Sequence, residues 1–173
     1  MTGVVGDDEQ VFRRIRKQVA DQTCYKVEKG KLIFSSTAFN DPAKSPSFDR
    51  AVLKHLCDPH LSRKSSADGV VSLRTGDIRN LGPIPRNDGK GRPVGKHAVD
   101  VVPNPRIGNC SHALVVTRDN PANSVFKRLK EALARLADQA GWTVEPDCDL
   151  PERHGNQLQD GVKCLVNRAR GRI

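Results

Sequence analysis

The sequence predicts one small α+β domain, a mostly antiparallel sheet with two main amphipathic helices packed on it. The chain has 173 residues, the size of a single domain with one core. Short apolar runs of strand length recur along it, and two segments place apolar residues at helical spacing. Its 11 Pro and 14 Gly residues separate short elements with long connections. We assign the domain to residues 1–150 and expect residues 151–173 to be a basic, partly ordered C-terminal segment.

The first predicted helix lies within residues 8–22. Its apolar positions, spaced as on one helix face, are Val11, Phe12, Ile15 and Val19. The basic residues between them are Arg13, Arg14, Arg16 and Lys17. This pattern predicts an amphipathic helix with a basic outer face.

Residues 24–27 and 31–34 follow as two short strands. Gly30 joins them, because glycine readily takes the positive φ of a tight turn. Residues 35–42 then have the Ser, Asn, Asp and Pro content of a turn.

Residues 48–56 predict a short helix that starts near Asp49. Residues 69–73 are a continuous apolar run, typical of a buried strand. Thr75 is placed to cap one helical turn, which Gly82 ends.

Residues 82–96 are dense in Pro and Gly and nearly without apolar side chains. They predict a flexible, exposed insertion loop. Residues 97–102 and 110–116 predict two further strands that pair with each other.

The main helix is predicted over residues 121–140. Asn120 suits the N-cap, Pro121 suits the first helical position, and Gly141 ends the helix. Residues 142–144 begin another extended piece. The apolar stripe of the helix is Phe126, Leu129, Leu133 and Leu136, with Val125 and Ala132 beside it.

The chain is basic, with 29 Lys and Arg residues against 20 Asp and Glu, a net charge of +9. Such a balance favours acidic partners, either nucleic acid or an acidic protein surface. No apolar run is long enough to span a bilayer, and the N-terminus does not resemble a signal peptide. We therefore expect a cytoplasmic protein without membrane attachment.

A zinc site would have to come from the scattered Cys and His residues. The candidates are His55, Cys57, His60, Cys110 and His112. Their spacing matches no standard zinc signature. We expect no metal site and no cofactor, and we expect the five cysteines to be reduced thiols.

Two catalytic arrangements can be drawn from the residues. Tyr25 and Lys26 on a strand, followed by 35–37, are faintly similar to ADP-ribosyltransferase folds, but no Glu-x-Glu pair follows. An ordinary Ser/Thr turn is the favoured interpretation. His97 with Asp100 and His112 with Asp119 are possible acid–base pairs, with no nucleophile elbow, P-loop or HExxH beside them.

A nucleic-acid-binding face is the remaining candidate. It combines the basic residues of the two predicted helices, provided that both pack on the same side of the sheet. Phosphate contacts of this kind would be backbone-directed, because the aromatic residues are few. The predicted binding residues are Arg13, Arg16, Lys17, Lys127, Arg128 and Arg135.

The stretch from about residue 22 to 117 resembles a set of small uncharacterised bacterial proteins. The shared motifs are Ser-Ser-x-Ala-Phe at 35–39, Ser-x-Asp-Arg-Ala at 47–51 and Asn-x-x-His-Ala-Leu-Val at 109–115. The resemblance implies a bacterial origin and a setting among defence or mobile-element genes, and it lends no activity.

These observations favour a non-enzymatic accessory or binding module that docks on a protein or nucleic-acid partner through a basic surface. The alternative is a small enzyme acting on nucleotide or nucleic acid, either ADP-ribosyltransferase-like or metal-assisted. An enzyme would bring convergent polar groups into a concave pocket, and a binding module would present a basic face.

Overall fold

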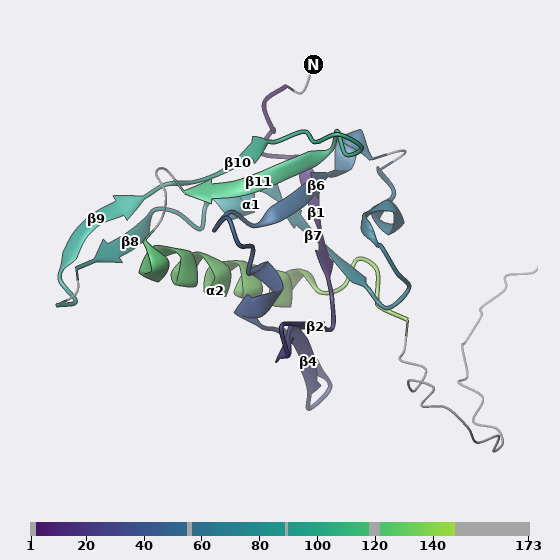
Figure 1. Cartoon of the computed structure of the whole chain (residues 1–173), viewed down its shortest axis with the longest axis horizontal. Coiled ribbons are helices and arrows are strands. Elements are labelled where there is room, and N and C mark those ends of the chain that lie inside the picture. Colours follow the sequence, from purple (N-terminus) through teal and green to yellow (C-terminus); the bar gives the residue numbers. More distant parts are fainter. Residues whose placement is uncertain (1–2, 55–56, 89, 118–121, 148–173) are drawn as a thin grey trace, which may run out of the picture.

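The computed structural model describes residues 3–54, 57–88, 90–117 and 122–147. Its centre is a five-stranded antiparallel sheet with the strand order β10-β11-β6-β1-β7. One long helix, α2 (Asn123–Ala140), lies across one face of this sheet (Figure 1). The strands are β1 (Gln10–Ile15), β6 (Ser47–Arg50), β7 (Gly69–Arg74), β10 (Val99–Pro103) and β11 (His112–Thr117).

The core lies between α2 and the sheet, because apolar residues alternate along the strands and line one stripe of the helix. β10 and β11 pair with Val101 opposite Val115, and both side chains are buried. The predicted buried strand at 69–73 and the predicted pairing of 97–102 with 110–116 are confirmed. On the helix, Val125, Leu129, Leu133 and Ala137 are buried against them.

The main helix is confirmed with small differences at its start. The helix begins at Asn123 with Ala122 in the N-cap position, and the predicted cap residues 120–121 lie outside the described residues. Gly141 ends the helix as predicted, with φ 70°. The chain then extends, and Val144 bridges Val70 at the edge of the sheet.

The predicted helix within residues 8–22 is wrong, so the fold has one main amphipathic helix where two were expected. The segment forms β1 followed by the short strands β2 (Gln18–Val19) and β3 (Gln22–Thr23). Val11 and Ile15 are four residues apart, a spacing that puts them on one face of a helix and also on one face of a strand. β1 gains ladder hydrogen bonds from β6 and β7 on its two sides, and this tertiary pairing decides between the two.

The predicted helix over residues 48–56 is also wrong. Its first residues form β6, and a 3₁₀ turn, η2 (Ala51–Leu53), follows. Phe48 and Arg50 are both buried there, a strand alternation hidden in the sequence because a buried arginine does not look like a core residue.

The single helical turn after β7 is confirmed as α1 (Thr75–Arg79). Arg74 occupies its N-cap position, so Thr75 does not cap the helix. The buried Thr75 hydroxyl has no hydrogen-bond partner among the described residues.

Three smaller units complete the described chain. β4 (Tyr25–Glu28) and β5 (Lys31–Phe34) form the predicted hairpin, with Gly30 at φ 75°. Two 3₁₀ turns, η1 (Ser36–Phe39) and η4 (Pro59–Ser62), connect strands. Where a loop was expected over 82–96, β8 (Ile84–Asn87) and β9 (Pro93–His97) form a hairpin; flexibility of this segment stays a prediction. No helix in the described part of the chain is long and apolar enough to cross a membrane.

Candidate anion-binding cleft

A cleft opens where β6 ends beside β1. β7 pairs with β1 along its whole length to Ile15, whereas β6 pairs with Val11 and Phe12 alone. Beyond Phe12, loops take the place of a paired strand on that side of β1. The space left between them is a cavity of about 300 Å³.

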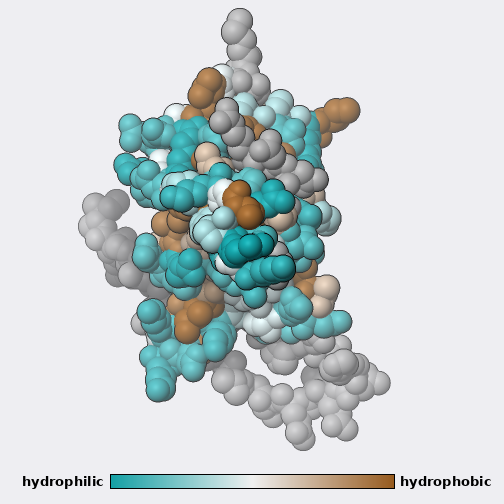
Figure 2. Space-filling model, turned by 90° about the vertical axis from the view of Figure 1, so that its left-hand side faces the viewer, coloured by the Kyte–Doolittle hydropathy of each residue, from teal (hydrophilic) through white to brown (hydrophobic). Residues whose placement is uncertain are grey.

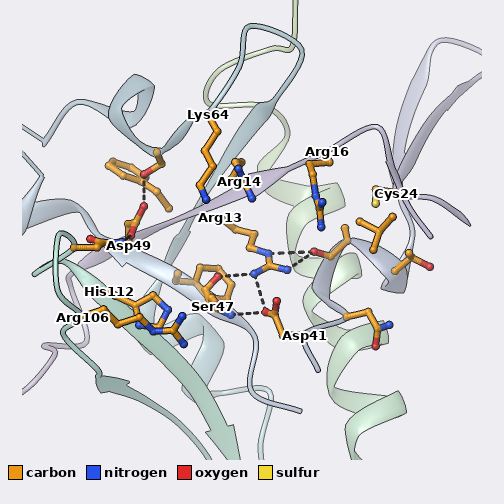
Figure 3. A pocket seen from close by; sticks show the side chains of 18 residues that line it. Arg13, Arg14, Arg16, Cys24, Asp41, Ser47, Asp49, Lys64, Arg106 and His112 are labelled. Atoms are coloured by element: carbon orange, nitrogen blue, oxygen red, sulfur yellow. Dashed lines mark hydrogen bonds and ion pairs between the residues drawn. The ribbon is translucent and has the colours of Figure 1, made fainter. Parts of the chain in front are cut away.

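Basic side chains from three parts of the chain surround this cavity (Figure 3). Arg13, Arg14 and Arg16 come from β1 and the residue after it. Lys64 follows η4, and Arg106 lies in the loop between β10 and β11. In Figure 3, Arg14, Arg16 and Lys64 lie along one rim, and Arg106 lies across the cavity from them beside His112.

Arg13 forms a fixed part of the cleft wall. Its guanidinium donates from Nε and Nη2 to the Ala38 carbonyl, at 3.1 and 2.8 Å. Nη1 donates to Asp41 Oδ2 at 2.8 Å and to the Ser47 carbonyl at 2.7 Å. The guanidinium carbon also lies 5.8 and 6.0 Å from the ring centres of Phe39 and Phe48. Arg13 therefore ties β1 to η1 and β6, and it brings a positive charge to the cavity in one fixed place.

The other basic residues of the cleft have weaker ion pairs than Arg13, or none among the described residues. Arg14 reaches Asp68 at 3.7 Å, a long ion-pair distance. Within the described ranges, no carboxylate lies at ion-pair distance from the side chains of Arg16, Lys64 or Arg106, and all three residues are exposed. Their charges are therefore open to an anion that enters the cleft.

The two carboxylates in the cleft lining are already occupied by the protein. Asp41 binds Arg13 and also accepts the Ser47 amide at 2.6 Å. Asp49 accepts from Asn109 and Ser62, each at 2.8 Å, and lies 3.2 Å from the Lys54 ammonium. Neither carboxylate leaves an unbalanced negative charge facing the cavity.

The pKa of Asp49 results from opposing effects. Burial raises it, but the hydrogen bonds from Asn109 and Ser62 and the nearby Lys54 charge outweigh burial and hold the pKa below its usual range. Asp49 is thus a stable carboxylate that joins β6 to the β10–β11 loop and to η4.

His112 is the histidine of the cleft lining. It begins β11 opposite Asp49, and it is 6% exposed. Its Nδ1 lies 2.8 Å from the Asn104 carbonyl. A carbonyl can only accept, so Nδ1 carries a proton and, in the neutral ring, Nε2 is the unprotonated nitrogen.

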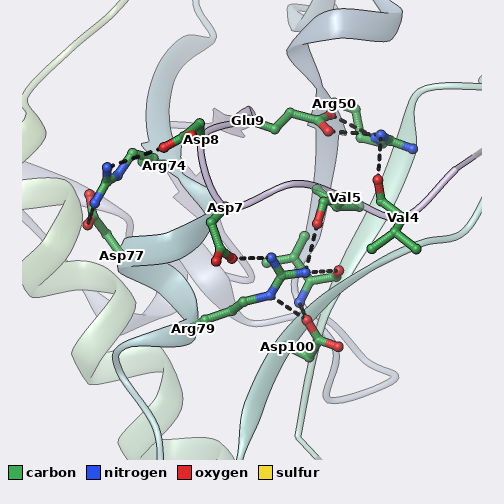
Figure 4. A network of polar contacts seen from close by, with 11 residues as sticks. Val4, Val5, Asp7, Asp8, Glu9, Arg50, Arg74, Asp77, Arg79 and Asp100 are labelled. Carbon is green, nitrogen blue, oxygen red and sulfur yellow. Dashed lines mark hydrogen bonds and ion pairs between the residues drawn. The ribbon is translucent and has the colours of Figure 1, made fainter.

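The acidic residues near the N-terminus pair with a different set of arginines (Figure 4). Arg50 donates to both oxygens of Glu9, at 2.7 and 2.8 Å. Arg79 binds Asp7 and lies 2.7 Å from Asp100. These acids are paired within their own network and are not part of the cleft lining.

The predicted binding residues fall in different places. Arg13 and Arg16 line the cleft, and Lys17 follows them without lining it. Of the α2 residues, Lys127 and Arg135 are exposed, and Arg128 donates to the Pro85 carbonyl at 2.9 Å. None of these three lines the cleft. The premise of two basic helices on one side of the sheet fails, because the first segment is a strand; the binding roles themselves stay predictions.

Three cleft residues were missed by the sequence prediction of the site, namely Arg14, Lys64 and Arg106. Arg14 was expected on the outside of a helix. Lys64 and Arg106 lie in connections that no local spacing links to β1. The long-range pairing of β1, β6 and β11 brings them together, and single-sequence patterns carry no direct signal for such pairing.

The zinc candidates do not gather in the part of the chain that the structure describes. Cys57, His60, Cys110 and His112 form no group of three or more ligating side chains there, and His55 lies outside the described residues. Cys24 is buried in the cleft wall, and burial raises the pKa of its thiol.

The other catalytic candidates are engaged in local structure. The Tyr25 ring packs edge-on against Trp142, with centroids 4.9 Å apart. Ser35 accepts from the Thr37 amide and caps η1, and the Thr37 hydroxyl lies 3.0 Å from Gln22 Oε1. Asp100 pairs with Arg79, and residue 119 lies outside the described residues.

No protein-family model, curated protein or solved structure matches this chain.

Proposed function

We propose that this protein is a binding module that holds the phosphate backbone of a nucleic acid in the basic cleft. One observation carries the proposal: the cavity is surrounded by five basic side chains, and Arg16, Lys64 and Arg106 have no carboxylate partner among the described residues. Uncompensated positive charge around a cavity is the electrostatic signature of an anion site.

Phosphate fits this lining better than a small carboxylate does. A guanidinium presents a planar fork of donors that matches phosphate oxygens. Guanidinium and ammonium groups stand on two sides of the cavity, as Figure 3 shows, so a tetrahedral anion between them can accept from several directions. The net charge of +9 further favours a polyanion over an isolated phosphate.

The recognition we propose is directed at the backbone and not at the bases. The aromatic residues of the cleft lining are Phe12 and Phe48, which are 5% and 2% exposed. Stacking on bases requires an exposed ring face. Binding should therefore depend on phosphate contacts and show little sequence preference.

A second candidate, a small enzyme acting on a nucleotide or nucleic acid, is favoured by His112 alone. Its Nε2 is available as a proton acceptor in a cleft that attracts phosphate esters. Incubating the protein with RNA and DNA, with and without Mg²⁺, tests this candidate. Strand cleavage that is lost in His112→Asn would replace the binding proposal with the enzyme.

The test of the binding proposal is a fluorescence anisotropy titration of labelled single strands and duplexes at low salt. We expect Arg16→Glu and Arg106→Glu to weaken binding at least about tenfold, since each reverses a charge at the cleft. Lys31→Glu is the matched control, because Lys31 is also exposed and lies in the β4–β5 hairpin, outside the cleft lining. Arg135→Glu tests whether the basic residues of α2 also bind nucleic acid, as the sequence predicts.

Two results would overturn the proposal. If Lys31→Glu weakens binding as much as the cleft variants, binding is diffuse attraction to a basic protein. If no nucleic acid binds even at low salt, a protein partner becomes the docking partner to test.

A further inference from the structure

The β8–β9 hairpin projects from the molecule as an arm. Figure 1 shows it extending past the end of the sheet and past the first turn of α2. The described residues between Pro85 and Lys96 are all exposed or half-buried. The end from which it projects is mostly hydrophilic in Figure 2.

The base of the arm is anchored in the fold. Ile84 and His97 pair with each other and are both buried, at 4% and 9% exposure. Arg128 of α2 donates to the Pro85 carbonyl at 2.9 Å. These contacts fix the direction in which the arm leaves the body.

The turn of the arm is organised by one carboxylate. Asp88 accepts from the amides of Lys90 and Arg92, at 2.8 and 2.9 Å, and from the Arg92 guanidinium at 2.9 Å. Gly91 supplies the positive φ, 80°. The arm therefore has a defined tip, although its composition resembles that of a loop.

The charge of the arm is positive on both faces and at the tip. Arg86 lies on the same face as Ile84, and Lys96 lies on the opposite face, because successive strand residues alternate. At the tip, Lys90 carries an exposed positive charge, whereas Arg92 pairs with Asp88. Over the described residues 82–88 and 90–97, Asp88 is the one acidic residue, and its carboxylate is used in the turn.

A two-stranded arm of this kind can enter the major groove of B-form DNA. That groove is about 12 Å wide and 8.5 Å deep and admits a two-stranded β-ribbon. The four residues of β8 reach about 14 Å at the rise of an antiparallel strand. Charge on both faces is what a ribbon between two phosphate backbones requires.

The outer edge of the arm is unsuited to adding a strand from a protein partner. β9 carries Pro93 and Lys96, the residue types that discourage edge-to-edge pairing. This observation favours a nucleic acid over a protein as the partner of the arm.

We propose that the β8–β9 hairpin is a second nucleic-acid contact, which enters the major groove and makes B-form duplex DNA the partner of this protein. The inference rests on the proposed function in that the ligand is again a nucleic acid, but it uses residues outside the cleft. Duplex RNA is excluded as an equal partner, because its major groove is too deep and narrow for protein side chains.

The experiment compares Arg86→Glu/Lys96→Glu with Arg16→Glu on three probes: duplex DNA, duplex RNA and single-stranded DNA of equal length. We expect the arm variant to lose at least about tenfold in affinity for duplex DNA and to stay within about twofold on the single strand. Arg16→Glu should weaken binding to both DNA probes. Lys29→Glu/Lys31→Glu, exposed sites of the β4–β5 hairpin with the same change of charge, is the matched control.

A fourth probe tests the groove directly. A DNA duplex whose major groove is filled by bulky C5 substituents on its pyrimidines should bind the parent protein at least about tenfold more weakly. The arm variant should bind the filled and unfilled duplexes equally. Thermal melting of each variant checks that the fold is retained, as we expect for substitutions at exposed side chains.

The outcomes separate the two proposals. If the arm variant binds duplex DNA as the parent does while Arg16→Glu weakens binding, the arm inference falls and the cleft stands. If only the arm variant weakens binding, the cleft proposal falls. If the arm variant loses equally on all probes, or the filled groove has no effect, the arm is not a groove-binding element.

Discussion

At the scale of single residues, the arginines of this protein divide by what they bind. Arg50 is buried and forms a bidentate ion pair with Glu9. Arg13 is held by hydrogen bonds to two backbone carbonyls and to Asp41. Arg16 and Arg106 have no such partner in the described chain. The first two hold the fold together, and the last two are free to meet an anion.

We predict that Glu9→Gln destabilises the protein by about 3–5 kcal/mol, because it leaves Arg50 as an uncompensated buried charge. The side chains of this pair are 7% and 8% exposed. Denaturant unfolding measures the change. Asp77→Asn is the control, since its pair with Arg74 is exposed and should contribute about 1 kcal/mol or less. Equal losses in the two variants would contradict this account.

A second prediction concerns acid stability. The pKa of Asp49 is held below its usual range in the folded protein, so its stabilising contribution is present above the unfolded pKa of about 3.9 and is lost as pH falls through the folded value. Asp49→Asn should therefore be less stable at neutral pH. Its stability should also fall less steeply than that of the parent below about pH 4. Parallel curves over that range would show that Asp49 does not carry this pH dependence.

At the scale of elements, the sequence predicted those whose pattern is decided locally. The α2 stripe, the Gly141 stop and the hairpin at Gly30 follow from periodicity and turn chemistry. β1 was not predicted, because the spacing of Val11 and Ile15 fits both a helix and a strand. Its pairing with two strands distant in the sequence makes this segment a strand. The same limit applies to the cleft, since two of its five basic residues, Lys64 and Arg106, meet β1 only through long-range pairing.

The β7 strand offers a test of packing at this scale. A Cβ on Gly69 would lie 2.4 Å from the Trp142 ring, so Gly69→Ala must displace that ring or the strand. We expect a loss of about 1–3 kcal/mol in unfolding free energy. Gly95→Ala in β9 is the matched control, because nothing lies within 4 Å of its added Cβ. A similar cost at both sites would mean that strand glycine itself, and not the Trp142 contact, sets the effect.

At the scale of the whole molecule, the ion pairs are unevenly distributed. Acidic residues near the N-terminus and on α1 and β10 pair with Arg50, Arg74 and Arg79 (Figure 4). The cleft is left with basic side chains whose nearby carboxylates are saturated. The basic side chains of the cleft that lack a carboxylate partner among the described residues are Arg16, Lys64 and Arg106.

The salt dependence of DNA affinity tests the central claim, that the cleft holds phosphate groups, most directly. Each phosphate contact contributes about 0.9 to the slope of log affinity against log salt for B-form DNA. We expect Arg16→Gln and Arg106→Gln each to reduce that slope by about one contact and Lys31→Gln to leave it unchanged. Slopes that are the same for the parent and both cleft variants would contradict the account.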